Sequence, residues 1–323
     1  MAKRQKRVAR KFLGPLALVT IIVFVVFTLP GFIIFQTYQK GNGSLIIVNE
    51  GGAPETDAAQ EEIIKLNADP LAISADKFTT VTKNRADVKN GSLVLVNTKR
   101  PFEGTISELT DFTDESNVNG EFFLSVYGLQ FSKEIAEPID RFTRAYTENF
   151  KRSNIYIYNT MSNNTEEFSL CPDYIEERST GCCIDIMIRD VELGKYDVSQ
   201  SNSYQWILEN CGKYGFIQRY PADKSEYTGT HCITYHFRYV GIVHASYMYE
   251  HNMCLEEYLQ ELKNHTYDNS PIIYQINNRN YEIYYEMAAP DSITQLHIPD
   301  GYDSSRYRIS GNNVDGFIVT VAL

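Results

Sequence analysis

Two short segments of the sequence gather residue types that bind metals and move protons. EERSTGCCIDI, residues 176–186, holds Cys183 and Asp185, and HCITYH, residues 231–236, holds His231 and His236. Thiolate, carboxylate and imidazole groups are the zinc ligands of proteins. Three such ligands leave one position for a water whose pKa the metal lowers, and a nearby carboxylate can then remove its proton. The two segments therefore suggest metal-assisted hydrolysis.

The surrounding segments must supply the strands and helices that position these side chains. NIYIYNTMS (154–162) and THCITYHFRYVG (230–241) are typical of strands. Helices are predicted from residue 135 onward, where Pro138 marks the start, over roughly 203–213, and over 255–265. After Pro271, β-prone stretches separated by turn residues predict a C-terminal β extension.

The period of a strand indicates which candidate ligands lie together. Cys183 would share a face with Asp185, and His231 would share a face with Ile233. Cys183, Asp185, His231 and His236 could therefore form a metal site with acceptable ligand types, although such sets are commonly structural.

Longer stretches of the chain resemble one protein family. WILENCGKYGFIQRYPADKSEYTG (206–229), YHFRYVGIVHA (235–245), LEEYL (255–259) and SLVLVNTKRPF (92–102) resemble the VanY-type D-alanyl-D-alanine carboxypeptidases. These are zinc peptidases that remove the terminal D-alanine of peptidoglycan stem peptides. The resemblance covers residues 90–265 and implies an α+β fold, a small mainly antiparallel sheet with packed helices. We therefore expect a D,D-carboxypeptidase-like domain over residues 87–268.

The zinc ligands of the family lie in two motifs that this chain keeps only in part. In the family pattern S-x-H-x-x-G-x-A-x-D, the histidine and the aspartate bind zinc, and EERSTGCCID (176–185) aligns with it. Asp185 matches the aspartate, and Arg178 replaces the histidine. In the pattern E-x-W-H, the glutamate is the general base and the histidine is the third zinc ligand. His236 matches this histidine in ITYH (233–236), and Ile233 stands at the general-base position.

A third family position concerns the substrate. An arginine of the family recognises the carboxylate of the substrate, and Ser162 stands at its position in NTMSN (159–163). The resemblance thus implies remnant metal ligands Asp185 and His236, with no intact catalytic residue and no carboxylate anchor.

These replacements predict that the zinc chemistry is lost. A guanidinium keeps its proton at every accessible pH, so Arg178 cannot ligate zinc. Ile233 offers no base, and loss of a general base slows such reactions by roughly 10²–10⁴-fold. We expect a pseudoenzyme without zinc that binds peptidoglycan stem peptides or a cell-envelope protein. The alternatives are an active zinc D-alanyl-D-alanine carboxypeptidase with a remodelled metal site, and a structural module that binds through its C-terminal strands.

The positive side chain of Arg178 raises a separate question. We expect its guanidinium to take the place of the metal cation and to pair with a buried Asp185 carboxylate. The competing interpretation is that Arg178 faces solvent from a loop.

The N-terminus predicts a membrane anchor. Residues 1–11 carry six basic residues and no acidic one, and residues 12–39 form an uncharged run of 28 residues. About 20 apolar residues suffice to cross a bilayer as a helix. The basic flank favours a cytoplasmic N-terminus, so we expect a single-pass membrane protein with an extracytoplasmic C-terminal domain. A cleaved signal peptide is the alternative.

Charge and composition divide the remainder of the chain. Residues 41–323 keep 23 of the 30 basic residues and all 41 acidic ones, a net charge of about −18. Such a surface repels polyanions, so nucleic acid is not expected as a partner. Residues 40–86 are typical of a linker and residues 269–323 of a β extension. The six cysteines lie outside the apolar run, and in an exported domain they predict at least one disulfide.

Overall fold

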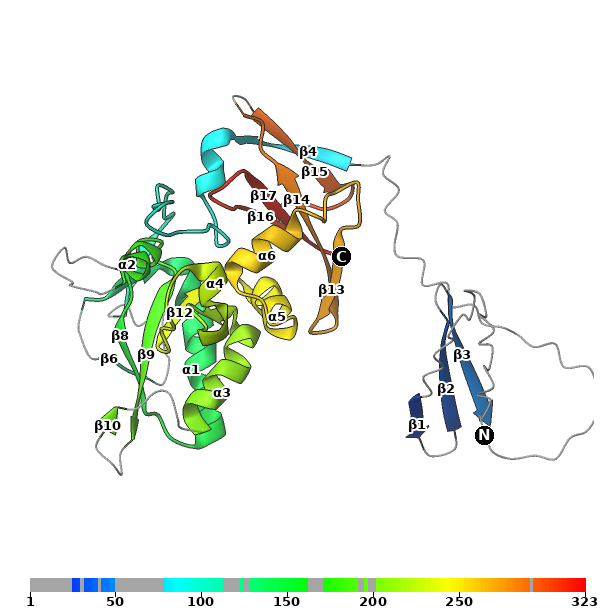
Figure 1. The fold of residues 1–323 in the computed structure, drawn as a ribbon, viewed down its shortest axis with the longest axis horizontal. Helices are drawn as coiled ribbons and strands as arrows, with labels where there is room; N and C mark the ends of the chain where they lie inside the picture. The colour runs from blue at the N-terminus through cyan, green and yellow to red at the C-terminus, as the bar shows by residue number, and fades with distance from the viewer. Residues whose placement is uncertain are drawn as a thin grey trace, which may run out of the picture. The chain divides into compact units, whose positions relative to one another are not determined.

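The chain consists of two compact units in the computed structural model. The structure describes residues 25–29, 32–39, 42–49, 78–112, 122–124, 128–161, 171–190, 195–196, 202–290 and 293–323. One unit spans Met1–Ala72 and the other Ile73–Leu323 (Figure 1). Each unit is described by itself.

The N-terminal unit contains an antiparallel sheet of three strands in sequence order. These are β1 (Val25–Leu29), β2 (Phe32–Gln39) and β3 (Asn42–Asn49). The predicted transmembrane helix over 12–39 is therefore not found over residues 25–39, and residues 12–24 lie outside the described residues. An apolar run rich in Val, Ile and Phe has no period that separates helix from strand. Among the described residues, no helix is both long and apolar enough to cross a membrane.

The sheet that carries the sequence motifs has six strands and is mainly antiparallel. Its order is β11 (Phe216–Gln218), β12 (His236–Tyr239), β9 (Cys183–Asp190), β8 (Ile155–Asn159) and β6 (Phe123–Leu124), with β10 (Lys195–Tyr196) paired to β9. Only β6 and β8 run parallel. The predicted α+β class is thereby confirmed. A further short antiparallel pair joins β5 (Leu109–Asp111) to β7 (Gln130–Ser132).

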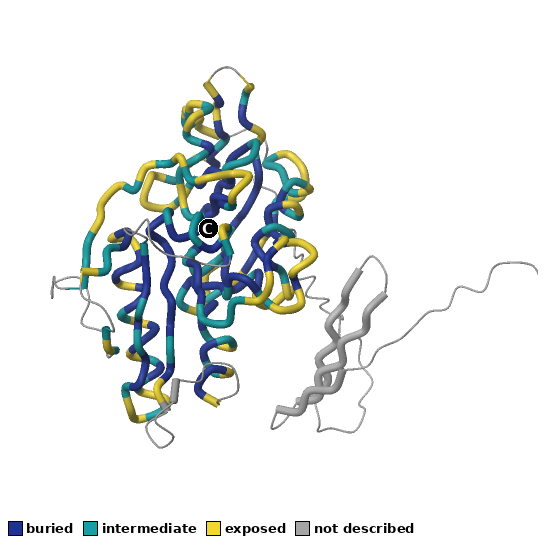
Figure 2. The backbone as a smooth tube through the Cα atoms, turned by 60° about the vertical axis from the view of Figure 1, so that its left-hand side comes forward, coloured by how far each residue is buried: buried dark blue, intermediate teal, exposed yellow. Residues whose placement is uncertain are grey.

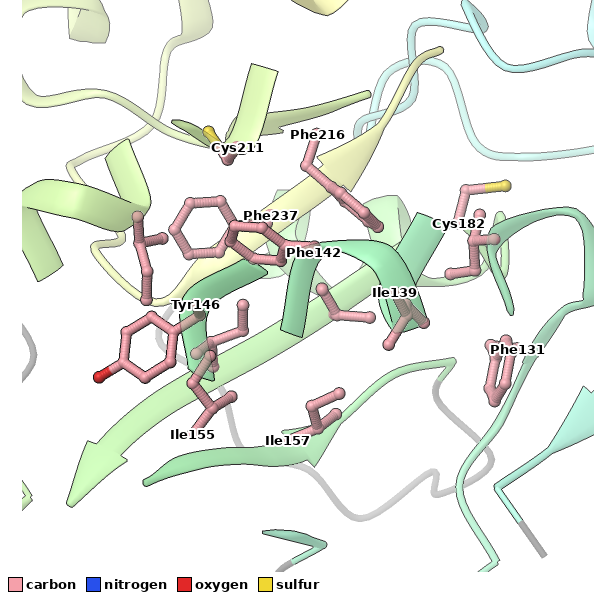
Figure 3. Close-up of a cluster of buried hydrophobic side chains, with 14 of the residues drawn as sticks. Phe131, Ile139, Phe142, Tyr146, Ile155, Ile157, Cys182, Cys211, Phe216 and Phe237 are labelled. Atoms are coloured by element: carbon pink, nitrogen blue, oxygen red, sulfur yellow. The ribbon is translucent and has the colours of Figure 1, made fainter. Parts of the chain in front are cut away.

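Helix α1 (Ala136–Phe150) provides the main apolar layer against this sheet. Ile139, Phe142 and Tyr146 recur at helical spacing and are completely buried. Figure 3 shows these side chains gathered with Ile155 and Ile157 of β8. Helix α3 (Asn202–Asn210) adds Tyr204 and Ile207 to the same core. Figure 2 shows that burial is concentrated along such strands and inner helix faces.

The C-terminal strands form a second sheet that is packed on both faces. Its order is β13 (Ile272–Ile276), β14 (Arg279–Met287), β17 (Gly316–Ala322) and β16 (Tyr307–Gly311), and β15 (Ile293–Pro299) pairs with β4 (Phe78–Asn84). Helices α5 (Ile242–Glu250) and α6 (Leu255–Leu262) share one core with this sheet. A second core joins the sheet to β15.

The C-terminal sheet is part of the larger compact unit. Residues 269–323 belong to the same compact unit as the preceding domain, because their sheet is buried from both sides. Residues 42–49 and 78–84 of the predicted linker form β3 and β4.

Local signals place helix ends better than strand ends. The predicted helix over 203–213 appears as α3 followed by a 3-10 turn over Cys211–Tyr214, and it stops at Gly215 with φ of 90°. A Cβ atom at Gly215 would lie 2.5 Å from the Tyr239 ring, so only glycine fits there. The strand predicted over 230–241 is confined to β12, and residues 230–235 lead into it as a loop and turn.

The predicted disulfide is wrong. No disulfide bond joins any of the six cysteines, all of which are among the described residues. Cys182 directly precedes β9 and Cys183 is its first residue, so the two side chains lie on opposite faces of the sheet. The Cys182 thiol contacts Glu134, whereas the Cys183 thiol contacts the Glu177 carbonyl. Burial raises the pKa of Cys211 and Cys254 to about 12, so these thiols act as small apolar groups of the core.

Candidate functional site

The register of two neighbouring strands brings the remnant ligands together. Asp185 of β9 lies directly opposite His236 of β12. Both residues are almost completely buried, at 1% and 0% exposure. The structure thus unites two residues that are 51 positions apart in the sequence.

The Asp185 carboxylate uses both oxygens in contacts with neighbouring side chains. Its Oδ1 lies 2.6 Å from His236 Nδ1, and its Oδ2 accepts a short hydrogen bond from the Tyr174 hydroxyl. Tyr174 comes from helix α2 (Pro172–Arg178), which begins with Pro172 in its first turn. Burial and the adjacent Asp185 raise the pKa of Tyr174, so its hydroxyl keeps the proton that it donates.

The protonation of His236 follows from its neighbours. Burial by itself would lower the pKa of the imidazole, but Cys183 and Asp185 outweigh burial and raise it to about 10. The charged imidazolium therefore compensates the buried Asp185 carboxylate. Its Nε2 atom is buried and has no hydrogen-bond partner among the described residues.

Arg178 is buried beside this pair but does not contact it directly. Its side chain is at the end of α2, and the residue is 2% exposed, which excludes the solvent-facing alternative. Nε donates to the Thr160 carbonyl at 2.6 Å, and Nη2 donates to Asn159 Oδ1. The guanidinium also lies 5.3 Å from the centre of the Tyr174 ring.

The link from Arg178 to Asp185 is a relay rather than the expected ion pair. Asn159 accepts from Arg178 and donates through Nδ2 to the Tyr174 hydroxyl at 3.2 Å, and Tyr174 donates to Asp185. Within the described part of the chain, no arginine or lysine reaches ion-pair distance of Asp185. The expected direct pair is therefore corrected: a tyrosine and a histidine occupy both carboxylate oxygens.

The residues present do not fit a catalytic zinc. The third ligand position holds a guanidinium, which has no lone pair to offer. Among the described ranges, no three His, Cys, Asp or Glu side chains are grouped closely enough to hold a metal ion. His231 is exposed in the loop before β12, so the alternative set with Cys183 is not brought together.

Two further predicted positions lie around the pair. Ile233 is partly buried, and its backbone N–H donates to the Tyr220 carbonyl at 3.1 Å, so the general-base position presents a hydrocarbon. The Tyr220 ring is stacked 6.3 Å from the His236 ring on one side, and the Tyr174 ring lies 4.8 Å from it. Ser162 lies outside the described residues.

A buried charge network next to Arg178 escaped the sequence reasoning. Glu177 is completely buried, and its Oε1 accepts from Arg238 Nη1 at 2.8 Å and from Arg219 Nε at 3.2 Å. Arg219 also donates to both carboxylate oxygens of Glu256, at 2.9 and 2.8 Å. The network joins α2 to β12, to the segment after β11, and to α6. Burial alone would lower the pKa of Arg219, but Glu177 and Glu256 raise it.

One sequence signal could have revealed part of this network. Arg238 lies two residues after His236, so a strand places both on the same face. A buried histidine at position 236 therefore implies that Arg238 is also buried and needs a carboxylate partner. The partner itself, Glu177, is 61 positions away and no local pattern indicates it.

Comparison with known proteins identifies the family of the chain. The family model for VanY, D-alanyl-D-alanine carboxypeptidase, matches residues 134–242. A D-alanyl-D-alanine carboxypeptidase of Enterococcus faecium is 32% identical over 256 residues, which cover 75% of this chain and 78% of that protein. An Enterococcus faecalis D-alanyl-D-alanine carboxypeptidase is 27% identical over 212 residues, or 60% of this chain and 75% of that protein.

A solved structure extends the similarity to the fold. The crystal structure of the vancomycin resistance D,D-dipeptidase VanXYg, in complex with a D-Ala-D-Ala phosphinate analog, matches with a TM-score of 0.61 at 26% identity. The match covers 76% of this chain and 99% of that chain.

Proposed function

Because the chain belongs to the VanY family of D-alanyl-D-alanine carboxypeptidases, we propose that it is a pseudoenzyme that binds peptidoglycan stem peptides without hydrolysing them. The observation that carries the proposal is the buried Asp185–His236 pair. Its charges compensate each other, its third ligand position holds Arg178, and its general-base position holds Ile233. Such a site lacks both a metal ligand and a base, but it keeps the framework of the family.

The choice of a stem peptide rests on relatives. VanXYg, which matches this fold, was solved with a D-Ala-D-Ala phosphinate analog, a mimic of a stem-peptide end. Loss of an arginine at Ser162 weakens recognition of a terminal carboxylate, so a cell-envelope protein is the competing ligand. A full-length chain titrated with a pentapeptide ending in D-Ala-D-Ala distinguishes the two. Binding of this peptide, and not of its D-Ala-D-lactate analogue, supports the proposal, whereas absence of binding points to the protein ligand.

The decisive measurement of activity is made on the same full-length chain. After incubation with zinc and removal of excess metal, we expect less than stoichiometric zinc and no release of D-alanine from the pentapeptide. One tightly held zinc per chain together with turnover would instead establish the alternative, an active zinc carboxypeptidase with a remodelled site.

A restoration variant tests the physical reason. Arg178→His/Ile233→Glu returns an imidazole to the third ligand position and a carboxylate to the general-base position. We expect this variant to retain zinc and to release D-alanine. The matched control, Arg178→Gln/Ile233→Gln, removes the same two side chains without supplying a histidine or a carboxylate. Equal zinc retention in both variants would contradict the assignment of these positions.

We further propose that the protein is anchored in the cell membrane by residues 12–39, with an extracytoplasmic C-terminal domain. The support comes from the sequence alone, an uncharged run of 28 residues behind a basic segment, although Val25–Leu29 and Phe32–Gln39 of this run form β1 and β2 in the structure. Alkaline extraction of membranes should leave the full-length chain in the pellet, whereas a chain lacking residues 1–40 should be released. Recovery of both chains in the supernatant would exclude the anchor.

A further inference from the structure

A cavity lies away from the remnant metal site. It has a volume of about 400 Å³ and is bounded by the start of α5, by β16 and by the beginning of β14. None of Asp185, His236, Tyr174 and Arg178 lines it. Strand β12 runs from His236 to Tyr239, and only the Tyr239 end reaches the cavity.

The wall of this cavity is rich in positive charge. Arg279, Arg306 and Arg308 line it, with Glu134 as the one carboxylate of the lining. None of the three arginines forms an ion pair within the described part of the chain. The pKa of the exposed Asp303 is lowered mainly by hydrogen bonds from Ser305, and Arg306 adds only a smaller contribution. Residues 41–323 carry a net charge of about −18, so three gathered guanidiniums stand out from the rest of this region.

The arginines keep donors available for a ligand. Arg306 donates Nε and Nη2 to the Ala322 carbonyl, at 3.0 and 2.6 Å, which fixes its side chain while Nη1 stays available. Arg308 is held through Nη1 by the Tyr307 carbonyl at 2.9 Å. A planar guanidinium carries paired N–H donors, which match two oxygens of a phosphate better than the donors of any other side chain.

The first turn of α5 adds backbone donors to the same wall. Ile242, Val243 and His244 line the cavity, and the backbone bond of this turn is Ala245 N–H to the Gly241 carbonyl. The N–H groups of residues 242–244 have no acceptor among the described residues. Gly241 has φ of 92°, which permits the sharp entry into this nine-residue helix. A helix start of this kind carries partial positive charge and favours anions.

We propose that this cavity, the arginine pocket, binds a small organic molecule through a phosphate group. Three guanidiniums and a helix start exceed what a singly charged carboxylate needs, whereas a phosphate monoester carries close to two negative charges. The cavity is also larger than one phosphate ion and lies within the usual size range of small-molecule sites. The rings of Tyr239, Tyr281 and Tyr307 line it and provide contact area for the organic portion.

Isothermal titration of the full-length chain with glycerol 3-phosphate tests the proposal. Inorganic phosphate, glycerol and acetate are the comparison probes. We expect glycerol 3-phosphate to bind, inorganic phosphate to compete with it, and glycerol and acetate to produce no competition.

Two double variants locate the binding. Arg279→Ala/Arg308→Ala removes two exposed arginines of the pocket and should weaken glycerol 3-phosphate binding at least about tenfold, since hydrogen bonds to charged groups are lost. Arg141→Ala/Arg144→Ala removes the same charge from the exposed face of α1 and should leave the affinity within about twofold, because neither arginine lines the pocket and exposed charges are screened.

Three results would overturn the proposal. These are absence of binding by either phosphate, equal losses in the two double variants, and competition by acetate as effective as that by phosphate. The melting temperatures of both variants should equal that of the unmodified chain, because all four arginines are exposed.

Discussion

Replacement of the buried Glu177 by glutamine tests the charge network that holds the frame of the site. Glutamine keeps the shape and one carbonyl acceptor but removes the negative charge. Arg219 would keep Glu256 as its partner, whereas Arg238 would keep only uncharged acceptors: the glutamine carbonyl and the carbonyls of Ser92 and Tyr239, the latter two at 3.1 Å. Arg238 would then be a buried cation without a carboxylate.

The expected loss follows from that uncompensated charge. Breaking a buried ion pair by removal of one partner costs about 3–5 kcal/mol in unfolding free energy. For a domain of this size the same loss corresponds to a drop of about 6–20 °C in melting temperature. Burial of Glu177 and Arg238 is complete, so solvent screening does not reduce this value.

Urea unfolding followed by circular dichroism measures the effect. The control is Glu137→Gln on α1, where an exposed carboxylate faces Arg141 at 3.4 Å and the change should stay within about 0.5 kcal/mol. A double-mutant cycle with Arg238→Met should show that the double variant loses less than the sum of the single losses. Equal midpoints for Glu177→Gln and Glu137→Gln would refute the reasoning.

The remaining predictions concern three other buried groups. Arg178→Ala removes the guanidinium donor from the Thr160 carbonyl and from Asn159 Oδ1, which still accepts from the Thr160 N–H at 3.2 Å, and should cost about 1–3 kcal/mol. The loss is measurable as a lower melting temperature than that of the exposed control Arg144→Ala, and equal temperatures would exclude the relay. Burial raises the pKa of Glu282 from 4.5 to about 7, so the folded state binds a proton that the unfolded state releases, and stability falls as pH rises through this window. Glu282→Gln should therefore stabilise the protein at pH 8 by up to about 3 kcal/mol and have little effect at pH 4.5, as urea titrations at the two pH values would show. Burial lowers the pKa of His244 from 6.5 to about 4, so between these pH values the unfolded state binds a proton that the folded state does not. In the Glu282→Gln variant, the free energy of unfolding should therefore fall as the pH is lowered from 6.5 to 4. A free energy that stays constant over this range would contradict the lowered pKa of His244.

The sequence predicted the parts of the fold that local periodicity encodes. The spacing of Ile139, Phe142 and Tyr146 defines a helix, and it is the one that covers the sheet. The proximity of Asp185 and His236 followed from the resemblance, because no local pattern relates residues so far apart. The apolar run over 12–39 illustrates the opposite case, since its composition carries no period that decides between helix and strand.

The contacts of Arg178 could not be derived from the sequence. Its partners lie at the end of β8, and the tyrosine that completes the relay lies one turn earlier on its own helix. The sequence indicated correctly that a buried carboxylate needs compensation, but it could not rank His236 and Tyr174 above the nearby guanidinium. That ranking depends on register and on helix orientation, which arise only when the sheet and α2 are packed together.

The buried pair explains how this framework persists without a metal ligand set. A carboxylate inside a protein requires positive charge or hydrogen bonds to both oxygens. Asp185 obtains both from the His236 imidazolium and the Tyr174 hydroxyl, so its burial depends on no dication. Arg178 then contributes by holding Asn159, which orients Tyr174. The separate Glu177 network fixes α2, the helix that carries Tyr174 and Arg178. A metal ion at the Asp185 oxygens would compete with the His236 contact at Oδ1 and with the Tyr174 hydrogen bond at Oδ2. The replacement of the third ligand by Arg178 and the enclosure of the Asp185–His236 pair by neighbouring side chains therefore belong to the same arrangement of residues.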